Sequence, residues 1–523
     1  MKQILHIFLK DARHFWAEIL FCVALLAAMV LLFPGQWPGN AFGGLGAASY
    51  SPSRSTLQLL TQSLNLFIPL SWVLLIARIV HTESLVGDRQ FWLTRPYEWR
   101  KLIAAKLLFL LSFLYLPLLI SHWLLLVEAG FRPLSYIPGM LYNLLLITII
   151  LILPLFSLAT VTSSFARLIL TLFGIFLFIA GLLILGSFVD IGDVSIPGSS
   201  AVQLALMLCL GGAAILVQYA SRAIWLARLL LIAFPVLFLL IGACIPDGPQ
   251  INRAFPLPPV SRPANVQLAY NPEPNIRHPA TLRSAKSVLI AIPIQALGTA
   301  EGALIILDDI QVAIEAPDGS RWTSSWQNLY GNSHLPVDKH VTAEFKMPRA
   351  VYEKLRSQAL SVHLTFAVTQ AQTANLTSIP LPTQGDSVPD LGICWTDTYP
   401  AGTTNQAFEI GCRSALRDPQ LTHAVLQWSD PRCNPAQTEP DKSVQGIGWR
   451  GSFDDSPAQF GLSAVRTQAF LFENTYRDPQ HSQEPYPCPG SRVIFTQYSL
   501  VGRTQARLDL RDFHLPDLSL LNR

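Results

Sequence analysis

Hydrophobic residues dominate the first half of the chain. Seven apolar runs there have the length of a membrane-crossing helix, because a hydrocarbon core of about 30 Å takes about 20 helical residues. The runs cover residues 15–33, 62–80, 102–127, 139–161, 166–188, 201–220 and 227–245. The pattern predicts an α-helical polytopic membrane domain, with about seven transmembrane helices, over residues 1–245.

The second half has a different pattern, in which short β-branched runs alternate with turn signals. Examples are SVLIAIPIQA, ALIILDDIQVAIEA and ALSVHLTFAV. Such runs are typical of β-strands. Residues 246–264 are a proline-rich linker. We expect residues 265–523 to form a mainly-β, sandwich-like domain, either as one unit or as two modules that divide near residue 380.

The first residues show a third pattern. Ile4, Ile7, Phe8 and Phe15 recur at helical spacing among basic residues. This pattern predicts an N-terminal helix that lies in the cytoplasmic membrane interface before the first span. The alternative is that the segment is simply the charged end of that span.

The positions of the basic residues predict the orientation. Lys and Arg in short loops stay on the cytoplasmic side of a membrane. With the N-terminus inside, the outer loops hold only Arg54 and Arg132, and the cytoplasmic side holds Lys2, Lys10, Arg13, Arg78, Arg89, Arg95, Arg100, Lys101, Arg167, Arg222 and Arg228. We therefore expect a multi-pass protein of the bacterial cytoplasmic (inner) membrane with a cytoplasmic N-terminus and an extracytoplasmic C-terminal domain.

Four cysteines lie in the polar half: Cys394, Cys412, Cys433 and Cys488. An even set outside the cytoplasm suits disulfides, although a sequence alone allows three pairings. Nearness favours Cys394 with Cys412 and Cys433 with Cys488. A zinc site is the competing interpretation, but no C-x-x-C or C-x-x-H spacing occurs.

Other chemistry is not visible in the sequence. The formal net charge is only +3, and no basic cluster with interleaved aromatic residues predicts binding to nucleic acid. The histidines lack metal-ligand spacing, and no G-x-S-x-G, H-E-x-x-H or G-x-x-x-x-G-K-[ST] motif is present. We expect no catalytic, cofactor-binding or metal-binding residues on this chain, and no enzymatic activity of its own.

One polar segment, HTESLVGDRQFWLTRPYEWRK at residues 81–101, interrupts the apolar half. Leu85, Phe91 and Trp92 are suited to docking on lipid or protein in a short helix. Arg95 precedes Pro96 and is therefore disfavoured in helical geometry. We expect the helix to break there, and the next helix to begin at Pro96.

This segment resembles the corresponding part of the type-2 exporter class of ABC transporter permeases. In that class a Glu, a Gly, an apolar stretch and a Pro-containing segment followed by a basic residue lie between the second and third spans. The residues that match in order are Glu83, Gly87, Phe91, Leu93, Pro96, Arg100 and Lys106. The resemblance covers roughly residues 1–220, whereas the seventh span and the large external domain depart from the usual six-span core.

The resemblance implies a function. The polar segment would act as a coupling helix on a separate cytoplasmic ATPase, which would bind the ATP and Mg²⁺, and the permease would pair with a second copy or with another permease subunit. The coupling residues would be Glu83, Gly87, Asp88, Phe91, Trp92, Arg95, Pro96, Arg100 and Lys101, and Arg167 would be a second cytoplasmic contact. The alternative function is a membrane-anchored extracytoplasmic binding or assembly module without transport.

Overall fold

The structure is a computed structural model. It describes residues 2–37, 52–82, 98–188, 200–244, 267–271, 281–282, 287–297, 303–329, 334–336, 341–389, 391–398, 406–415, 421–427, 462–474 and 490–516.

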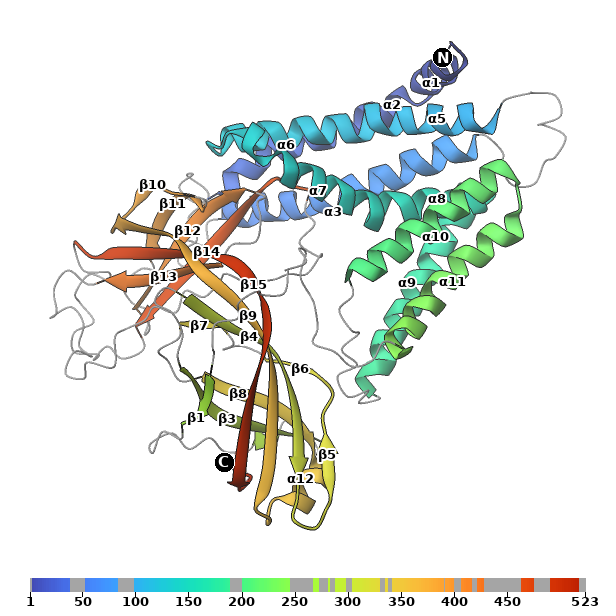
Figure 1. Cartoon of the computed structure of the whole chain (residues 1–523). Coiled ribbons are helices and arrows are strands. Elements are labelled where there is room, and N and C mark those ends of the chain that lie inside the picture. The colour runs from blue at the N-terminus through green and yellow to red at the C-terminus, as the bar shows by residue number, and fades with distance from the viewer. Residues whose placement is uncertain are drawn as a thin grey trace.

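The chain folds into an N-terminal helical region followed by a C-terminal β-rich region (Figure 1). The helical elements are α1 (Lys2–His14), α2 (Trp16–Leu32), η1 (Phe33–Gln36), α3 (Pro52–His81), α5 (Trp99–Leu110), η2 (Leu111–Tyr115), α6 (Leu116–Glu128), η3 (Pro133–Tyr136), α7 (Ile137–Ile147), η4 (Thr148–Ile152), α8 (Leu153–Val161), α9 (Phe165–Phe188), α10 (Ser200–Ala220) and α11 (Ile224–Cys244).

Among the residues that the structure describes, four helical stretches are long and apolar enough to cross a membrane. They are Trp16–Gly35, Leu59–His81, Trp99–Glu128 and Pro133–Val161. The helices α9, α10 and α11 are also apolar, and within the described residues their apolar stretches are shorter. The chain is therefore a candidate membrane protein with four such helices, and the number seven stays a prediction.

Two of these stretches contain a π-helical turn, and each turn ends two residues before a proline. η2 comes before Pro117, and η4 comes before Pro154. A proline has no N–H, and its ring collides with the carbonyl four residues earlier. The wider π turn removes that collision while the helix continues.

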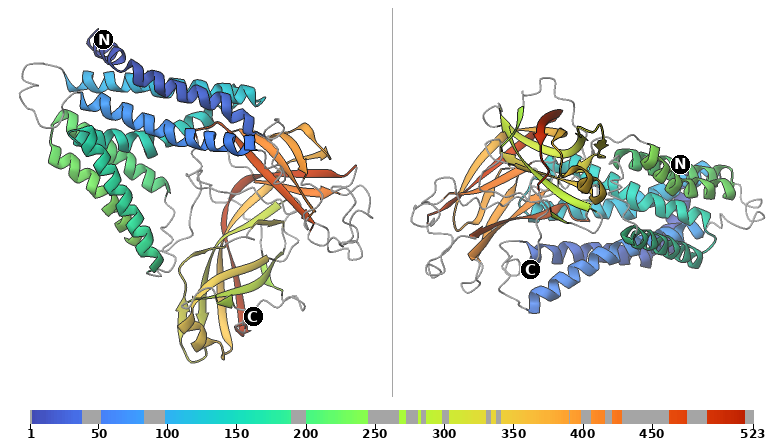
Figure 2. Two further views of the ribbon diagram at one scale, coloured as in Figure 1. Left: turned by 180° about the vertical axis from the view of Figure 1, so that it is seen from behind. Right: turned by 90° about the horizontal axis from the view of Figure 1, so that it is seen from below.

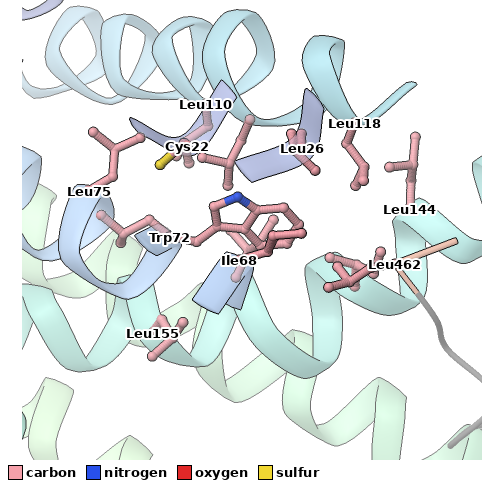
Figure 3. Packing of buried hydrophobic residues seen from close by; sticks show 14 of the residues in the cluster. Cys22, Leu26, Ile68, Trp72, Leu75, Leu110, Leu118, Leu144, Leu155 and Leu462 are labelled. Atoms are coloured by element: carbon pink, nitrogen blue, oxygen red, sulfur yellow. The ribbon is translucent and has the colours of Figure 1, made fainter. Parts of the chain in front are cut away.

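The core of the helical region is built around Trp72 of α3, whose side chain is 1% exposed. Figure 3 shows its ring among Cys22 and Leu26 of α2, Leu118 of α6, and Leu462, which comes from the β-rich region. The helices α10 and α11 pack on each other and on α8, at the side of the bundle away from α2 (Figure 2).

The described part of the β-rich region contains three antiparallel sheets, and the helix α12 (Arg349–Leu355) follows β8. The strands are β1 (Gln267–Tyr270), β2 (Thr281–Leu282), β3 (Ser287–Leu297), β4 (Ala303–Glu315), β5 (Arg321–Thr323), β6 (Gln327–Asn328), β7 (His334–Pro336), β8 (Val341–Pro348), β9 (Leu360–Pro380), β10 (Gln384–Val388), β11 (Gly392–Thr398), β12 (Gln406–Ala415), β13 (Leu421–Gln427), β14 (Val465–Asn474) and β15 (Arg492–Phe513).

The largest sheet has the order β13-β15-β9-β4-β5, with β6 and β7 also paired to β4. A second sheet has the order β1-β3-β2, with β8 on β3, and the third has the order β10-β11-β12-β14. Along these strands the buried residues alternate with exposed ones, as in β9 from Leu360 to Phe366, which is the pattern of a sheet with one face on a core.

The β-rich region has two main hydrophobic cores, and the long strands β9 and β15 contribute to both. One core joins β3, β4 and β8 to Leu364 of β9 and Leu508 of β15. The other joins β11, β12 and β14 to Ile379 of β9 and Phe495 of β15. The two cores are therefore connected through continuous strands, which are seen crossing from one to the other in Figure 1.

Candidate functional sites at the two ends of the helical bundle

Most of the predicted coupling residues lie outside the described residues: Glu83, Gly87, Asp88, Phe91, Trp92, Arg95 and Pro96. The structure describes the end of the segment, where α5 begins. There Lys101 Nζ lies 2.8 Å from Glu98 Oε1, and this hydrogen bond lowers the pKa of the Glu98 carboxyl. The guanidinium of Arg100 lies 5.3 Å from the ring centroid of Trp99.

A buried ion pair joins the N-terminal helix to α5. Lys106 Nζ lies 2.8 Å from Asp11 Oδ2, and the two side chains are 0% and 4% exposed. Next to this pair the ring of Phe8 stacks on that of Phe113, with centroids 5.6 Å apart. Two charges with so little solvent are stable only as a pair. An ion pair and apolar packing therefore both hold α1 against α5.

A second ion pair joins α3 to α2. Arg78, near the end of α3, pairs with Glu18 in the first turn of α2. Its guanidinium also lies 5.7 Å from the ring centroid of Phe15, the residue between α1 and α2. The last turn of α3, which leads into the predicted coupling segment, is thus held on the junction of the first two helices.

The loop between α8 and α9 lies at the same end. His81 Nε2 is 3.1 Å from Thr162 Oγ1, and the Thr162 hydroxyl itself donates to the carbonyl of Leu158. A hydroxyl has one proton, so His81 must be the donor to Thr162. Arg167 is exposed close by in the chain and donates through Nη1 to Ser163 Oγ at 2.7 Å. Arg167 therefore lies in the first turn of α9, five residues after the threonine that contacts the end of α3, and its role as a second cytoplasmic contact stays a prediction.

At the other end of the bundle the β-rich region inserts into the helices. Leu462 and Ala464, which precede β14, are buried in the helical core. The carbonyl of Leu462 lies 3.0 Å from Nε2 of His122 in α6, whose side chain is fully buried. A carbonyl can only accept, so His122 carries its proton on Nε2. This hydrogen bond fixes the residues that precede β14 on α6.

An arginine between two tryptophans forms a second contact at that end. Arg413 of β12 lies 5.0 Å from the ring centroid of Trp37, which follows η1, and 4.1 Å from that of Trp395 of β11. Burial lowers the pKa of the Arg413 guanidinium, and the carboxylate of Glu128 at the end of α6 acts in the opposite direction. The cation thus bridges the helical and β-rich regions through both rings and a nearby negative charge.

The strands that present this arginine are held rigidly. Cys394 and Cys412 form a disulfide between β11 and β12, which is the pairing favoured by nearness in the sequence. Each cysteine directly precedes a residue of the cation–π contact: Cys394 precedes Trp395, and Cys412 precedes Arg413. Cys433 and Cys488, the other predicted pair, lie outside the described residues.

A glycine allows the close approach of the two regions. Gly392 has a φ of +104°, and a Cβ there would lie 2.7 Å from Phe131 Cζ, in the loop after α6, and 1.8 Å from the carbonyl oxygen of Arg413. Only glycine fits this place, because a side chain would need both the disfavoured backbone conformation and the occupied space.

One continuous helical stretch connects the two ends. Residues Trp99–Glu128 are α5, η2 and α6 in succession, about 45 Å at 1.5 Å per residue. The stretch begins where the predicted coupling segment ends, and Figure 1 shows its far end beside the β-rich region. Its π turn is linked to that of the next stretch, because Tyr115 Oη lies 2.7 Å from Thr148 Oγ1.

Sequence reasoning missed most of these contacts. Asp11, Trp37 and Arg413 carry no motif, and their partners are distant in the sequence. The available signal was a charge next to an apolar run, as at Lys106 and Glu18, because such a charge needs a partner or water. In the part of the chain that the structure describes, no cluster of His, Cys, Asp or Glu side chains is arranged to hold a metal ion. No family model matches the chain, and no curated protein matches it.

Proposed function

We propose that this chain is the membrane-spanning permease subunit of an ATP-driven exporter, with seven spans, a cytoplasmic N-terminus and an extracytoplasmic β domain, in the bacterial inner membrane. A separate ATPase binds ATP and Mg²⁺ and pushes on residues 83–101. The permease works as a homodimer or with a second permease subunit.

One observation carries the proposal. The helices on both sides of the predicted coupling segment are cross-linked to their neighbours, through Arg78 with Glu18 and Lys106 with Asp11, and one of them continues for 30 residues to the β-rich region. A push on the segment would therefore move a connected set of helices rather than a loose loop. The π turn η2 gives the long stretch a place to bend.

The placement of charge agrees with the proposed orientation. The helix α1 and the β-rich region lie at opposite ends of the bundle (Figure 1), and Arg78, Arg100 and Lys101 lie at the α1 end. Basic residues collect on the cytoplasmic side of bilayers, which supports a cytoplasmic α1 and an external β domain.

Copurification with an ATPase tests the proposal. We expect the full chain to pull down a soluble protein with a phosphate-binding loop, and we expect Glu83→Ala and Arg100→Ala to lower the ATPase activity of the complex at least tenfold. Arg321→Ala, an exposed arginine of the β-rich region, is the matched control and should leave that activity unchanged. An ATPase activity indifferent to both coupling changes would contradict the proposal. Full cellular activity of residues 246–523 alone would favour the anchored binding module instead.

A further inference from the structure

The helix α1 has two distinct faces. Ile7 and Asp11 are buried, Asp11 pairs with Lys106, and Phe8 meets Phe109 edge-on, so one face is covered by α5. The opposite face is exposed and consists of Lys2, Leu5, His6, Leu9, Lys10 and Arg13. Residues three and four apart lie on the same side of a helix, so these side chains make one continuous strip, which we call the α1 outer face.

The α1 outer face is positively charged without a compensating acid of its own. It carries Lys2, Lys10 and Arg13, and the one acidic residue of α1, Asp11, is turned to the other side, where it pairs with Lys106. Among the described residues, no carboxylate lies within ion-pair distance of Lys2, Lys10 or Arg13. The charges of the face are therefore available to an anionic partner.

The α1 outer face also exposes apolar side chains. Leu5 is 52% exposed and Leu9 is 45% exposed, one helical turn apart. Trp16, the first residue of α2 and of the span Trp16–Gly35, is 65% exposed. Tryptophan is enriched where hydrocarbon meets water. Because α1 ends only two residues before Trp16, its last turn lies close to the level at which that span begins.

We infer that the α1 outer face binds the headgroups of anionic phospholipids, with Leu5 and Leu9 entering the edge of the acyl region. Basic side chains attract an anionic leaflet, and exposed leucines gain by leaving water for lipid. An acidic protein would match the charges of the face, but charge complementarity alone does not account for the two exposed leucines. The lipid accounts for both features.

Amide hydrogen exchange of the full chain tests this inference. The chain is placed in nanodiscs of phosphatidylcholine alone and in nanodiscs of phosphatidylcholine with added phosphatidylglycerol. We expect the amides of α1 to exchange several-fold more slowly when phosphatidylglycerol is present. In the triple variant Lys2→Gln, Lys10→Gln, Arg13→Gln, we expect the apparent affinity for that lipid to fall by about fivefold for each charge removed. The matched control, Arg321→Gln, Arg356→Gln, Arg507→Gln, removes the same charge from exposed positions of the β-rich region and should leave the affinity unchanged.

Three outcomes would overturn the inference. The first is that the α1 amides exchange at the same rate in nanodiscs with and without phosphatidylglycerol. The second is that phosphatidylglycerol slows the exchange of these amides in the triple variant as much as in the wild type. The third is protection of α1 in detergent by inorganic phosphate or by polyglutamate to the same extent as by phosphatidylglycerol, which would assign the face to free phosphate or to an acidic protein. Unchanged exchange in α5 shows that the variant is folded. No ATPase is present in this experiment, so its result is independent of the proposed transport function.

Discussion

The guanidinium of Arg413 lies 5.0 Å from the ring centroid of Trp37, so a cation of the β-rich region rests on an aromatic ring of the helical region. Arg413 is 8% exposed, and a desolvated cation–π contact contributes about 2 kcal/mol. We predict that Arg413→Leu loosens the docking of the two regions and accelerates proteolysis between them. Limited proteolysis of the detergent-purified protein measures this rate.

Arg413→Lys keeps the charge but loses the planar group that stacks on both rings, so an intermediate effect is expected. Arg507→Leu, at an exposed position of β15, is the control and should behave as wild type. Equal proteolysis rates for Arg413→Leu and wild type would show that the cluster does not hold the regions together.

The ion pair between Asp11 and Lys106 predicts a strong difference between single and double changes. Asp11→Leu or Lys106→Met alone leaves an uncompensated buried charge, which should cost about 3–5 kcal/mol. The double variant removes both charges and should recover most of the loss. Thermal unfolding in detergent measures all three proteins, and additive losses would argue against a buried pair.

A side chain at position 392, where the two regions meet, should lower the stability of the protein. Gly392→Ala should destabilise the protein by more than the roughly 1–2 kcal/mol of a left-handed alanine, because the new Cβ would meet Phe131 and the Arg413 carbonyl. Gly319→Ala is the matched control, since Gly319 also has a positive φ but has no atom within 4 Å of the added Cβ. Equal losses in the unfolding temperature of the two variants would contradict the predicted clash.

The hydrogen bond between Tyr115 and Thr148 predicts coupling between the two π turns. The Thr148 hydroxyl donates to the carbonyl of Leu144, so Tyr115 is the donor to Thr148. A double-mutant cycle with Tyr115→Phe and Thr148→Val should give a coupling energy of about 0.6–1.7 kcal/mol, as found for hydrogen bonds between spans. A coupling energy of zero would mean that the π turns act independently.

The disulfide predicts sensitivity to reductant. It connects residues 18 apart, and closing a loop of that length stabilises a protein by about 3 kcal/mol. The variant Cys394→Ser, Cys412→Ser should unfold at a lower temperature than the wild type. Dithiothreitol should lower the unfolding temperature of the wild type by more than that of the variant, which keeps the predicted pair of Cys433 and Cys488. Equal losses in the two proteins would contradict a stabilising contribution from the bond between Cys394 and Cys412.

Local patterns in the sequence were sufficient for much of the fold. The apolar runs predicted helices, and the run from Ala303 became the strand β4 almost residue for residue. The boundaries were less predictable: α3 begins at Pro52, ten residues before the expected span, because its first turns are polar yet helical. The runs SRVIFTQYSLV and QARLDLRDF form the single strand β15, because bulges near Gly502 let the strand continue past its irregular middle.

The candidate sites were less accessible to sequence reasoning, for a physical reason. Arg413 and Trp37 are brought together only when the two regions dock, and neither position differs in its local pattern from an ordinary strand or loop. The pair of Cys394 and Cys412 was accessible because strands joined by a short connection tend to be neighbours. The coupling segment stays a prediction, since Glu83, Pro96 and the residues between them are outside the described part of the chain.

The sharing of β15 between the two β cores has a consequence for biogenesis. Leu508 and Leu510 complete the core that β3 and β4 begin, although those strands are synthesised much earlier. That core therefore stays incomplete until β15 has been translated, although β3, β4, β8, β9 and α12 together already supply most of its residues. Late-forming contacts of this kind fold slowly and expose aggregation-prone intermediates. We therefore expect the early half of the β-rich region to reach its final packing only after its last strand has been synthesised.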